Sequence, residues 1–237
     1  MDSPFYLHQQ RDIVGTYNLF CMSIADRISS TELRDLLLSL VALVVAFSVL
    51  MNGKRIPGLE TILIITMGVG TGFLLHEMAH KFVALHFGYF AEYRANWMGL
   101  LFAVAASFAG FIFAAPGAVM ISKPTATQEF YMQDSFGQEE LRQEIKKETL
   151  CISLAGPMTN IVLAAFFFLA LMFAPSSSTA TQAANFALSI NLILAAFNLL
   201  PFGPLDGKKI FDSNRTVWLL VGLPTILLAL PIYFGRV

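Results

Sequence analysis

The stretch TILIITMGVGTGFLLHEMAHKFVALHF, residues Thr61–Phe87, is long and apolar enough for a membrane helix, yet it contains an HExxH pattern. On a helix, residues four positions apart share one face, so His76 and His80 can bind one zinc ion. Glu77 then lies beside the metal, where a carboxylate can take a proton from a water that zinc activates. Ionisable residues are costly in lipid, which favours a functional metal site here over a chance match.

The composition of the whole chain agrees with a membrane setting. Of 237 residues, 56% are hydrophobic and 13% are charged. Soluble proteins average about 25% charged residues, so an ordinary soluble enzyme is excluded. The net charge of −1 offers no basic footprint for a nucleic acid. The two cysteines, Cys21 and Cys151, stand outside any CxxC pattern and predict neither a disulfide framework nor a cysteine metal site.

Several apolar segments have the length that a bilayer requires, and they predict an all-α polytopic membrane protein with about five or six transmembrane helices. The segments are Leu33–Met51, Thr61–Phe87, Trp97–Ile121, Leu150–Ala174, Ala183–Leu200 and Val217–Phe234. We expect a polar N-terminal arm over residues 1–32 and a single transmembrane domain over residues 33–237. A hydrophilic loop over residues 125–149 should contain a short solvated helix, Gln138–Glu148.

A catalytic zinc needs a third protein ligand, and Asp206 is the leading candidate. It stands in NLLPFGPLDG, residues Asn198–Gly207, where an apolar helix breaks at Pro and Gly. A broken helix can present an acidic ligand at a membrane boundary, although an ordinary Asp-Gly turn at a helix end is the alternative. The sequence has no histidine after Phe87, and the acidic residues of the 125–149 loop should be solvated.

The topology gives a test of this assignment. The HExxH end of its helix and Asp206 lie on one side only if an even number of crossings separates them. Leu150–Ala174 and Ala183–Leu200 already supply two crossings. We therefore expect Trp97–Ile121 to re-enter the membrane with a break at Ala115–Gly117, although its length alone also allows a crossing helix.

The basic residues favour re-entry, because lysine and arginine gather on the cytosolic side of membrane proteins. With re-entry, the side that holds the N-terminus and the metal-binding end has most of them. That side carries Arg11, Arg27, Arg34, Arg94, Lys123, Arg142, Lys146, Lys147, Lys208, Lys209 and Arg215, and the opposite side carries Lys54, Arg55 and Arg236. We expect a multi-pass protein of the cell membrane whose N-terminus and active-site end face the cytosol.

Three motifs in this order and spacing resemble the site-2 protease family of intramembrane zinc metalloproteases, most of all its compact archaeal members. The motifs are HEMAH, AGPMTN at Ala155–Asn160, and NLLPFGPLDG. The resemblance implies that His76, His80 and Asp206 bind Zn²⁺ and that Glu77 is the catalytic acid and base.

The resemblance also implies support of the transition state by Asn198 and Asn160. In that family the region after HExxH forms small membrane-embedded strands, one of which pairs with substrate. Pro116–Ile121 resembles that strand, although the apolar run before it is longer than the family's minimal pattern. The implied substrate-binding residues are Pro116, Gly117, Ala118 and Val119. Lys208 stands where the family often has a second glycine, which puts the local turn in question.

We therefore expect a zinc metalloprotease that cleaves within or near the transmembrane segments of other membrane proteins. A non-proteolytic zinc transporter or sensor is the alternative. It would not need Glu77 between the histidines, and it would usually show polar residues along several helices. A membrane metalloprotease with a glutamate as third ligand would need a membrane-depth glutamate after HExxH, which the sequence lacks. A purely structural membrane protein would leave the ionisable residues at membrane depth unexplained.

Overall fold

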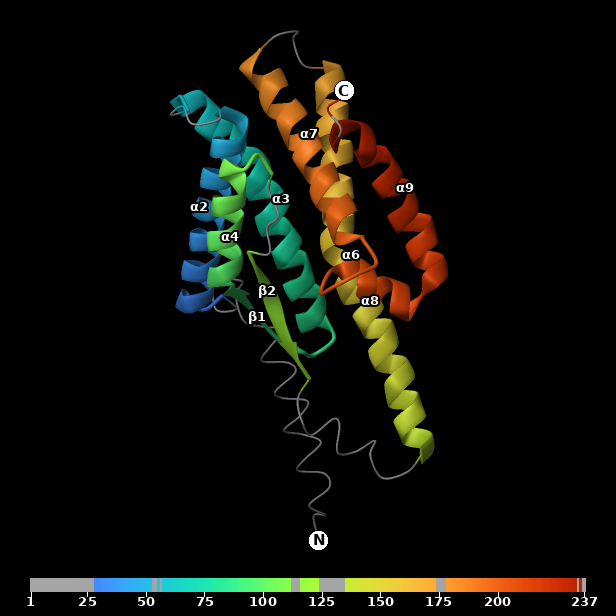
Figure 1. Cartoon of the computed structure of the whole chain (residues 1–237). Helices are drawn as coiled ribbons and strands as arrows, with labels where there is room; N and C mark the ends of the chain where they lie inside the picture. The colour runs from blue at the N-terminus through green and yellow to red at the C-terminus, as the bar shows by residue number, and fades with distance from the viewer. Residues whose placement is uncertain are drawn as a thin grey trace.

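The chain folds as a bundle of helices with one small sheet (Figure 1). The computed structural model describes residues 28–52, 55, 57–111, 116–123, 135–173, 178–233 and 235. Within them, five helices are long and apolar enough to cross a membrane. These are α2 (Ser30–Asn52), α3 (Leu59–His86), α6 (Ser135–Phe173), α7 (Thr179–Asn198) and α9 (Arg215–Tyr233). The expected all-α polytopic fold is confirmed.

Between α3 and α6, the described residues form no helix long enough to cross a membrane. Strand β1 (Phe90–Ala95) comes first, followed by α4 (Trp97–Phe108) with 12 residues. At 1.5 Å per residue this helix is roughly 18 Å long, which is too short for a hydrocarbon core of roughly 30 Å. Ala115 lies outside the described residues, and Pro116 leads directly into strand β2 (Gly117–Ser122). The expectation that residues 97–121 do not cross as one helix is confirmed.

The two strands form an antiparallel pair beside α2 and α3. The register runs from Phe90 opposite Ser122 to Ala95 opposite Gly117. Alternate side chains of β1 are buried, and Tyr93 belongs to the main apolar core. This follows from the period of two in a strand, which turns every second side chain toward the helices. The strand expected at residues 116–121 is thus present, beginning one residue later.

Helix α6 is longer than the sequence predicts. Gln138–Glu148, expected as a separate helix in a hydrophilic loop, is the first part of the 39-residue α6. Glutamate, lysine and glutamine are good helix formers, so the change from polar to apolar residues marks a change of surroundings and not a helix end. Other parts of the expected elements lie outside the described residues: 1–27, 124–134, Ala174 and Phe234.

The arrangement of α6 and α7 brings the two halves of the candidate site together. Both helices pack against α3 and against each other. The chain runs along α6 and returns along α7, so the C-terminal ends of α3 and α7 lie at the same end of the bundle (Figure 1). Helix α8 (Asp206–Ser213) begins there.

A buried ion pair joins α2 to α3 beside the sheet. The Nζ of Lys81 bonds the carboxylate of Glu32, and the two side chains are 1% and 0% exposed. The second carboxylate oxygen of Glu32 accepts the backbone N–H of Tyr93 at 3.0 Å. Glu32 therefore connects the strand β1 to the helix that contains HExxH, at the residue directly after His80.

We expect Lys81→Met to lower the free energy of unfolding by about 3–5 kcal/mol, because it leaves the buried charge of Glu32 without its partner. The double variant Glu32→Gln/Lys81→Met should recover most of this loss, since both buried charges are then removed and glutamine still accepts the N–H of Tyr93. Reversible unfolding in detergent micelles measures both variants. A loss of only about 1 kcal/mol in the single variant, as for an exposed pair, would contradict a structural role for this contact.

Candidate metal centre

Helix α3 directs two imidazoles to one point. His76 and His80 lie one turn apart, and their Nε2 atoms are 3.1 Å apart. Both residues are buried, with 5% and 7% of their surface exposed. A neutral imidazole has one nitrogen with a lone pair, so two such nitrogens at this distance suit a cation placed between them.

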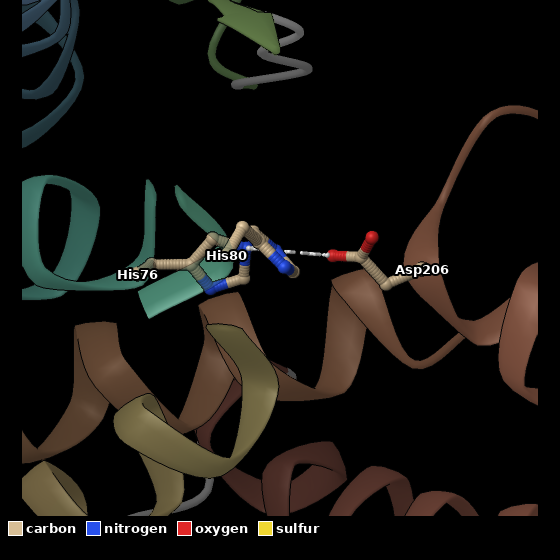
Figure 2. Close-up of side chains that lie close together, drawn as sticks. All are labelled: His76, His80 and Asp206. Atoms are coloured by element: carbon tan, nitrogen blue, oxygen red, sulfur yellow. Dashed lines mark hydrogen bonds and ion pairs between the residues drawn. The ribbon is translucent and has the colours of Figure 1, made fainter. Parts of the chain in front are cut away.

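Asp206, the first residue of α8, meets this pair from the other side (Figure 2). Its Oδ2 lies 3.0 Å from the Nε2 of His80 and 3.5 Å from the Nε2 of His76. In a tetrahedral zinc site with bonds of about 2.0–2.1 Å, neighbouring ligand atoms are about 3.3 Å apart. The three separations lie close to this value, and the structure thus brings the three sequence-predicted ligands together.

The turn after α7 positions Asp206 through two glycines. Gly203 has a φ of +63°, in the left-handed region that favours glycine. A Cβ on Gly207 would lie 2.2 Å from the backbone carbonyl of Leu199. Only glycine therefore allows the start of α8 to pack against the end of α7.

The two lysines after Asp206 have different surroundings. The Nζ of Lys208 lies 2.6 Å from the carboxylate of Asp212 on the exposed side of α8, so its departure from the family pattern leaves the turn intact. The Nζ of Lys209 lies 3.5 Å from Oδ1 of Asp206. Burial raises the pKa of the Asp206 carboxyl, but the interactions with His80 and His76 together outweigh burial and hold the pKa well below its usual range. The Asp206 carboxyl is therefore ionised at neutral pH.

A hydrogen bond sets the orientation of one histidine. The Nδ1 of His80 lies 2.7 Å from the carbonyl oxygen of Ile152 on α6. If Nδ1 carries the proton and donates it there, Nε2 keeps its lone pair for a metal, as in most histidine metal ligands. The Nδ1 of His76 is buried, and among the described residues it has no partner.

Glu77 lies buried beside the ligand pair, with 9% of its surface exposed. Sequence analysis assigns it the role of acid and base. A carboxylate at this position, directly after His76, can exchange a proton with a water held by the ligand pair.

Gly156 on α6 leaves the space that an ion requires. A Cβ at this position would lie 2.3 Å from the Nε2 of His80 and 2.6 Å from the Nε2 of His76. The bare backbone of Gly156 thus faces the point on which the ligand atoms converge. Two imidazoles, one carboxylate and this free space fit a zinc ion. Sequence analysis found Gly156 only as part of the motif Ala155–Asn160 and gave it no role.

The two predicted asparagines differ in their contacts. Asn160, one turn along α6 from Gly156, is fully buried, and neither atom of its amide has a partner among the described residues. Asn198 donates from Nδ2 to the carbonyl oxygen of Leu194 at 3.0 Å, within its own helix. Asn160 therefore has its whole amide available for hydrogen bonds, whereas Asn198 has already used one N–H.

Sequence analysis missed Asn191 on α7. It is fully buried, and within the described part of the chain its Oδ1 has no partner. This oxygen would lie 3.2 Å from a Cβ on Gly72, one turn before His76 on α3. A glycine at that position was the available signal, because it indicates the close approach of another helix.

The predicted substrate strand has a link to the metal centre. Val119 of β2 packs against an apolar cluster of Ala84, Ala91 and Ile152. Ile152 is also the residue whose carbonyl oxygen orients His80. Of the other predicted substrate-binding residues, Gly117 and Ala118 belong to β2, and the carbonyl of Pro116 accepts the N–H of Asn96 at 2.9 Å.

Comparison with known proteins agrees with the site. Residues 64–184 match the family model described as Peptidase family M50. A protein of Methanocaldococcus jannaschii named "Putative zinc metalloprotease" is 35% identical over 203 residues, which cover 84% of this chain and 93% of that protein. A Bacillus subtilis protein, also named "Putative zinc metalloprotease", is 31% identical over 174 residues, which cover 64% of this chain and 68% of that protein. No solved structure matches the chain.

We expect Gly156→Ala to abolish stoichiometric zinc binding, because the added Cβ occupies the space between the imidazoles. Gly70→Ala on α3 is the matched control, since a Cβ there meets only Leu40 at 3.7 Å, an ordinary contact. The zinc content of the protein purified in detergent, measured by mass spectrometry of the metal, distinguishes them. A folded Gly156→Ala protein with the zinc content of the wild type would contradict the assignment.

Proposed function

The chain belongs to peptidase family M50 and is a zinc metalloprotease, and we propose that it cleaves peptide bonds within or near the transmembrane segments of other membrane proteins. One observation carries the proposal. The three candidate ligands converge in a bundle whose long helices are all apolar enough to cross a membrane. A site built on such helices is reached most directly by a substrate that is itself in the membrane.

His76, His80 and Asp206 would hold the zinc ion. The separations of their ligand atoms and the space at Gly156 support this assignment. When bound, zinc polarises the scissile carbonyl and lowers the pKa of a coordinated water to about 7. Three protein ligands leave the fourth position to the reactants, as a catalytic zinc site requires.

Glu77 would move the proton. It takes a proton from the attacking water and returns it to the amine that leaves when the peptide bond breaks. Its position directly after His76 and its burial beside the ligand pair support this role.

Asn160 and Asn198 would stabilise the negative charge that develops on the scissile carbonyl oxygen. The unpaired amide of Asn160 supports this for the first residue. Asn198 uses one N–H of its amide on the carbonyl oxygen of Leu194, which leaves a single N–H for substrate. We therefore expect Asn160 to contribute more.

The substrate would have to unwind before cleavage, because a helix uses its peptide groups in its own hydrogen bonds. An unwound segment in the membrane needs new backbone partners. Addition of this segment as a strand to β2, along Gly117, Ala118 and Val119, would supply them. The short sheet lies beside the end of α3 that contains HExxH, which supports this mode of binding (Figure 1).

We also propose that this multi-pass protein resides in the cell membrane with its N-terminus and the metal centre on the cytosolic side. The common end of α3 and α7, together with the start of α2, supports this orientation (Figure 1). Basic residues of the first turns of α2, of β1 and of α8 belong to this end of the bundle, in line with the preference of basic residues for the cytosol. They are Arg34, Arg94, Lys208 and Lys209.

We expect Glu77→Gln to lower the rate of cleavage of a single-span substrate by at least about a hundredfold, because glutamine cannot accept the proton. The variant should keep its zinc, since Glu77 is not a ligand. Glu139→Gln, on the exposed first part of α6, is the control and should cleave at the wild-type rate.

The measurement is cleavage of the substrate in proteoliposomes, with zinc content determined on the same samples. Wild-type activity in Glu77→Gln would contradict the acid and base role. A wild-type protein that binds zinc but cleaves no membrane substrate would favour the non-proteolytic transporter or sensor.

A further inference from the structure

The outer edge of strand β1 is occupied by carboxylates of α2. Glu32 accepts the backbone N–H of Tyr93 at 3.0 Å, and Asp35 accepts the backbone N–H of Ala95 at 3.2 Å. These are alternate residues of one strand, so their N–H groups point to the same side. Two N–H donors of the β1 edge that faces α2, those of Tyr93 and Ala95, are therefore bonded already.

These contacts are fixed by buried neighbours. Glu32 is also paired with Lys81, and both side chains are almost fully buried. Ser39, on the same face of α2, accepts the hydroxyl of Tyr93 at 2.9 Å. Asp35 is 5% exposed. The polar residues of this face of α2 thus form a continuous seam along β1.

The register then decides which peptide groups of β2 point outward. In an antiparallel pair, residues opposite each other alternate between hydrogen-bonded and non-hydrogen-bonded pairs. Tyr93 and Ala95 direct their N–H groups to α2, so their partners Val119 and Gly117 belong to the non-hydrogen-bonded pairs. By the same period, Gly117, Val119 and Ile121 turn their peptide groups away from β1.

We propose that Glu32 and Asp35 are positioning residues that close the β1 edge, so that an extended segment of a transmembrane substrate adds only to the outer edge of β2. The substrate pairs there with the peptide groups of Val119 and Ile121. This inference rests on the proposed function and specifies how the same site selects and aligns its substrate.

The surroundings of the outer edge of β2 suit an unwound segment of a transmembrane substrate. Within the described residues the sheet has only two strands, which is marginal without a further partner. Met120 and Ile121 are 60% and 37% exposed, so the edge has apolar surroundings that suit a segment leaving the lipid. Val119 connects the edge to His80 through Ile152, which aligns an added strand beside the metal centre.

Disulfide crosslinking tests which strand the substrate joins. Met120 on β2 and Phe90 on β1 share the outer face of the sheet and have matched exposures of 60% and 63%. An added strand would lie about 4.8 Å from β2 but about 10 Å from β1, and a disulfide requires Cα atoms within about 7 Å. Each cysteine variant also carries Cys21→Ser and Cys151→Ser, which remove the native cysteines. It further carries Glu77→Gln, which keeps the substrate uncut.

The probe is a single-span substrate whose cleavage by the wild-type protein has been established first, with one cysteine moved along the residues around the cleavage site. We expect Met120→Cys to crosslink at alternate substrate positions, at least about tenfold more than Phe90→Cys. Equal or stronger crosslinking from Phe90→Cys, or crosslinks without alternation, would overturn the inference and leave the proposed function standing. Failure of the wild-type protein to cleave any such substrate would count against the proposed function itself.

A second pair of variants tests the hydrogen bond of Asp35. Asp35→Asn keeps an acceptor for the N–H of Ala95, whereas Asp35→Leu, of similar size, does not. We expect Asp35→Leu to raise KM for the substrate by about tenfold, with unchanged zinc content and little change in kcat. Asp35→Asn should restore the wild-type KM. A fall in kcat without a change in KM, or the same KM in both variants, would overturn the positioning role.

Discussion

Ligand atoms from two separate helices must meet at one point, and the path of the chain follows from this constraint. His80 on α3 and Asp206 on α8 approach within 3.0 Å. Their helices must therefore end and begin at the same end of the bundle, with two crossings, α6 and α7, between them. The segment between α3 and α6 has to return to the side it started from, and α4 with the two strands does so without crossing.

The close approach of α6, α7 and α8 around the three ligand side chains depends on glycines. Gly207 lets α8 start against the end of α7, and Gly156 keeps α6 clear of the imidazoles. The fixed charges near the sheet have a complementary role. Burying the charges of Glu32 and Lys81 is costly, and such a pair is stable only when its remaining hydrogen bonds are made. Here the N–H of Tyr93 donates to the second carboxylate oxygen of Glu32. The pair thus links the strands to the helix of the metal ligands.

The sequence was sufficient to predict the ligand-bearing helix and the re-entrant segment, because both rest on strong constraints. Ionisable groups at membrane depth are rare, and a crossing count is either even or odd. The long polar start of α6 was missed because hydropathy reports the surroundings of a helix and not its ends. The roles of Gly156 and Asn191 depend on contacts between helices far apart in sequence. Gly72 indicates that another helix comes close, but no local pattern identifies Asn191 as the residue it meets. The hydrogen bonds from the β1 backbone to Glu32 and Asp35 on α2 were not predicted, for the same reason.

X-ray absorption at the zinc edge of the purified, zinc-loaded protein tests the central claim most directly, because it reports the atoms around the metal. Ligation by His76, His80 and Asp206 predicts a shell of only nitrogen and oxygen at about 2.0–2.1 Å, with the outer-shell signal of two imidazoles. A sulfur neighbour at about 2.3 Å would contradict the account, as would a signal from fewer than two imidazoles. The same spectrum of Asp206→Ala should lose one protein oxygen and keep both imidazoles.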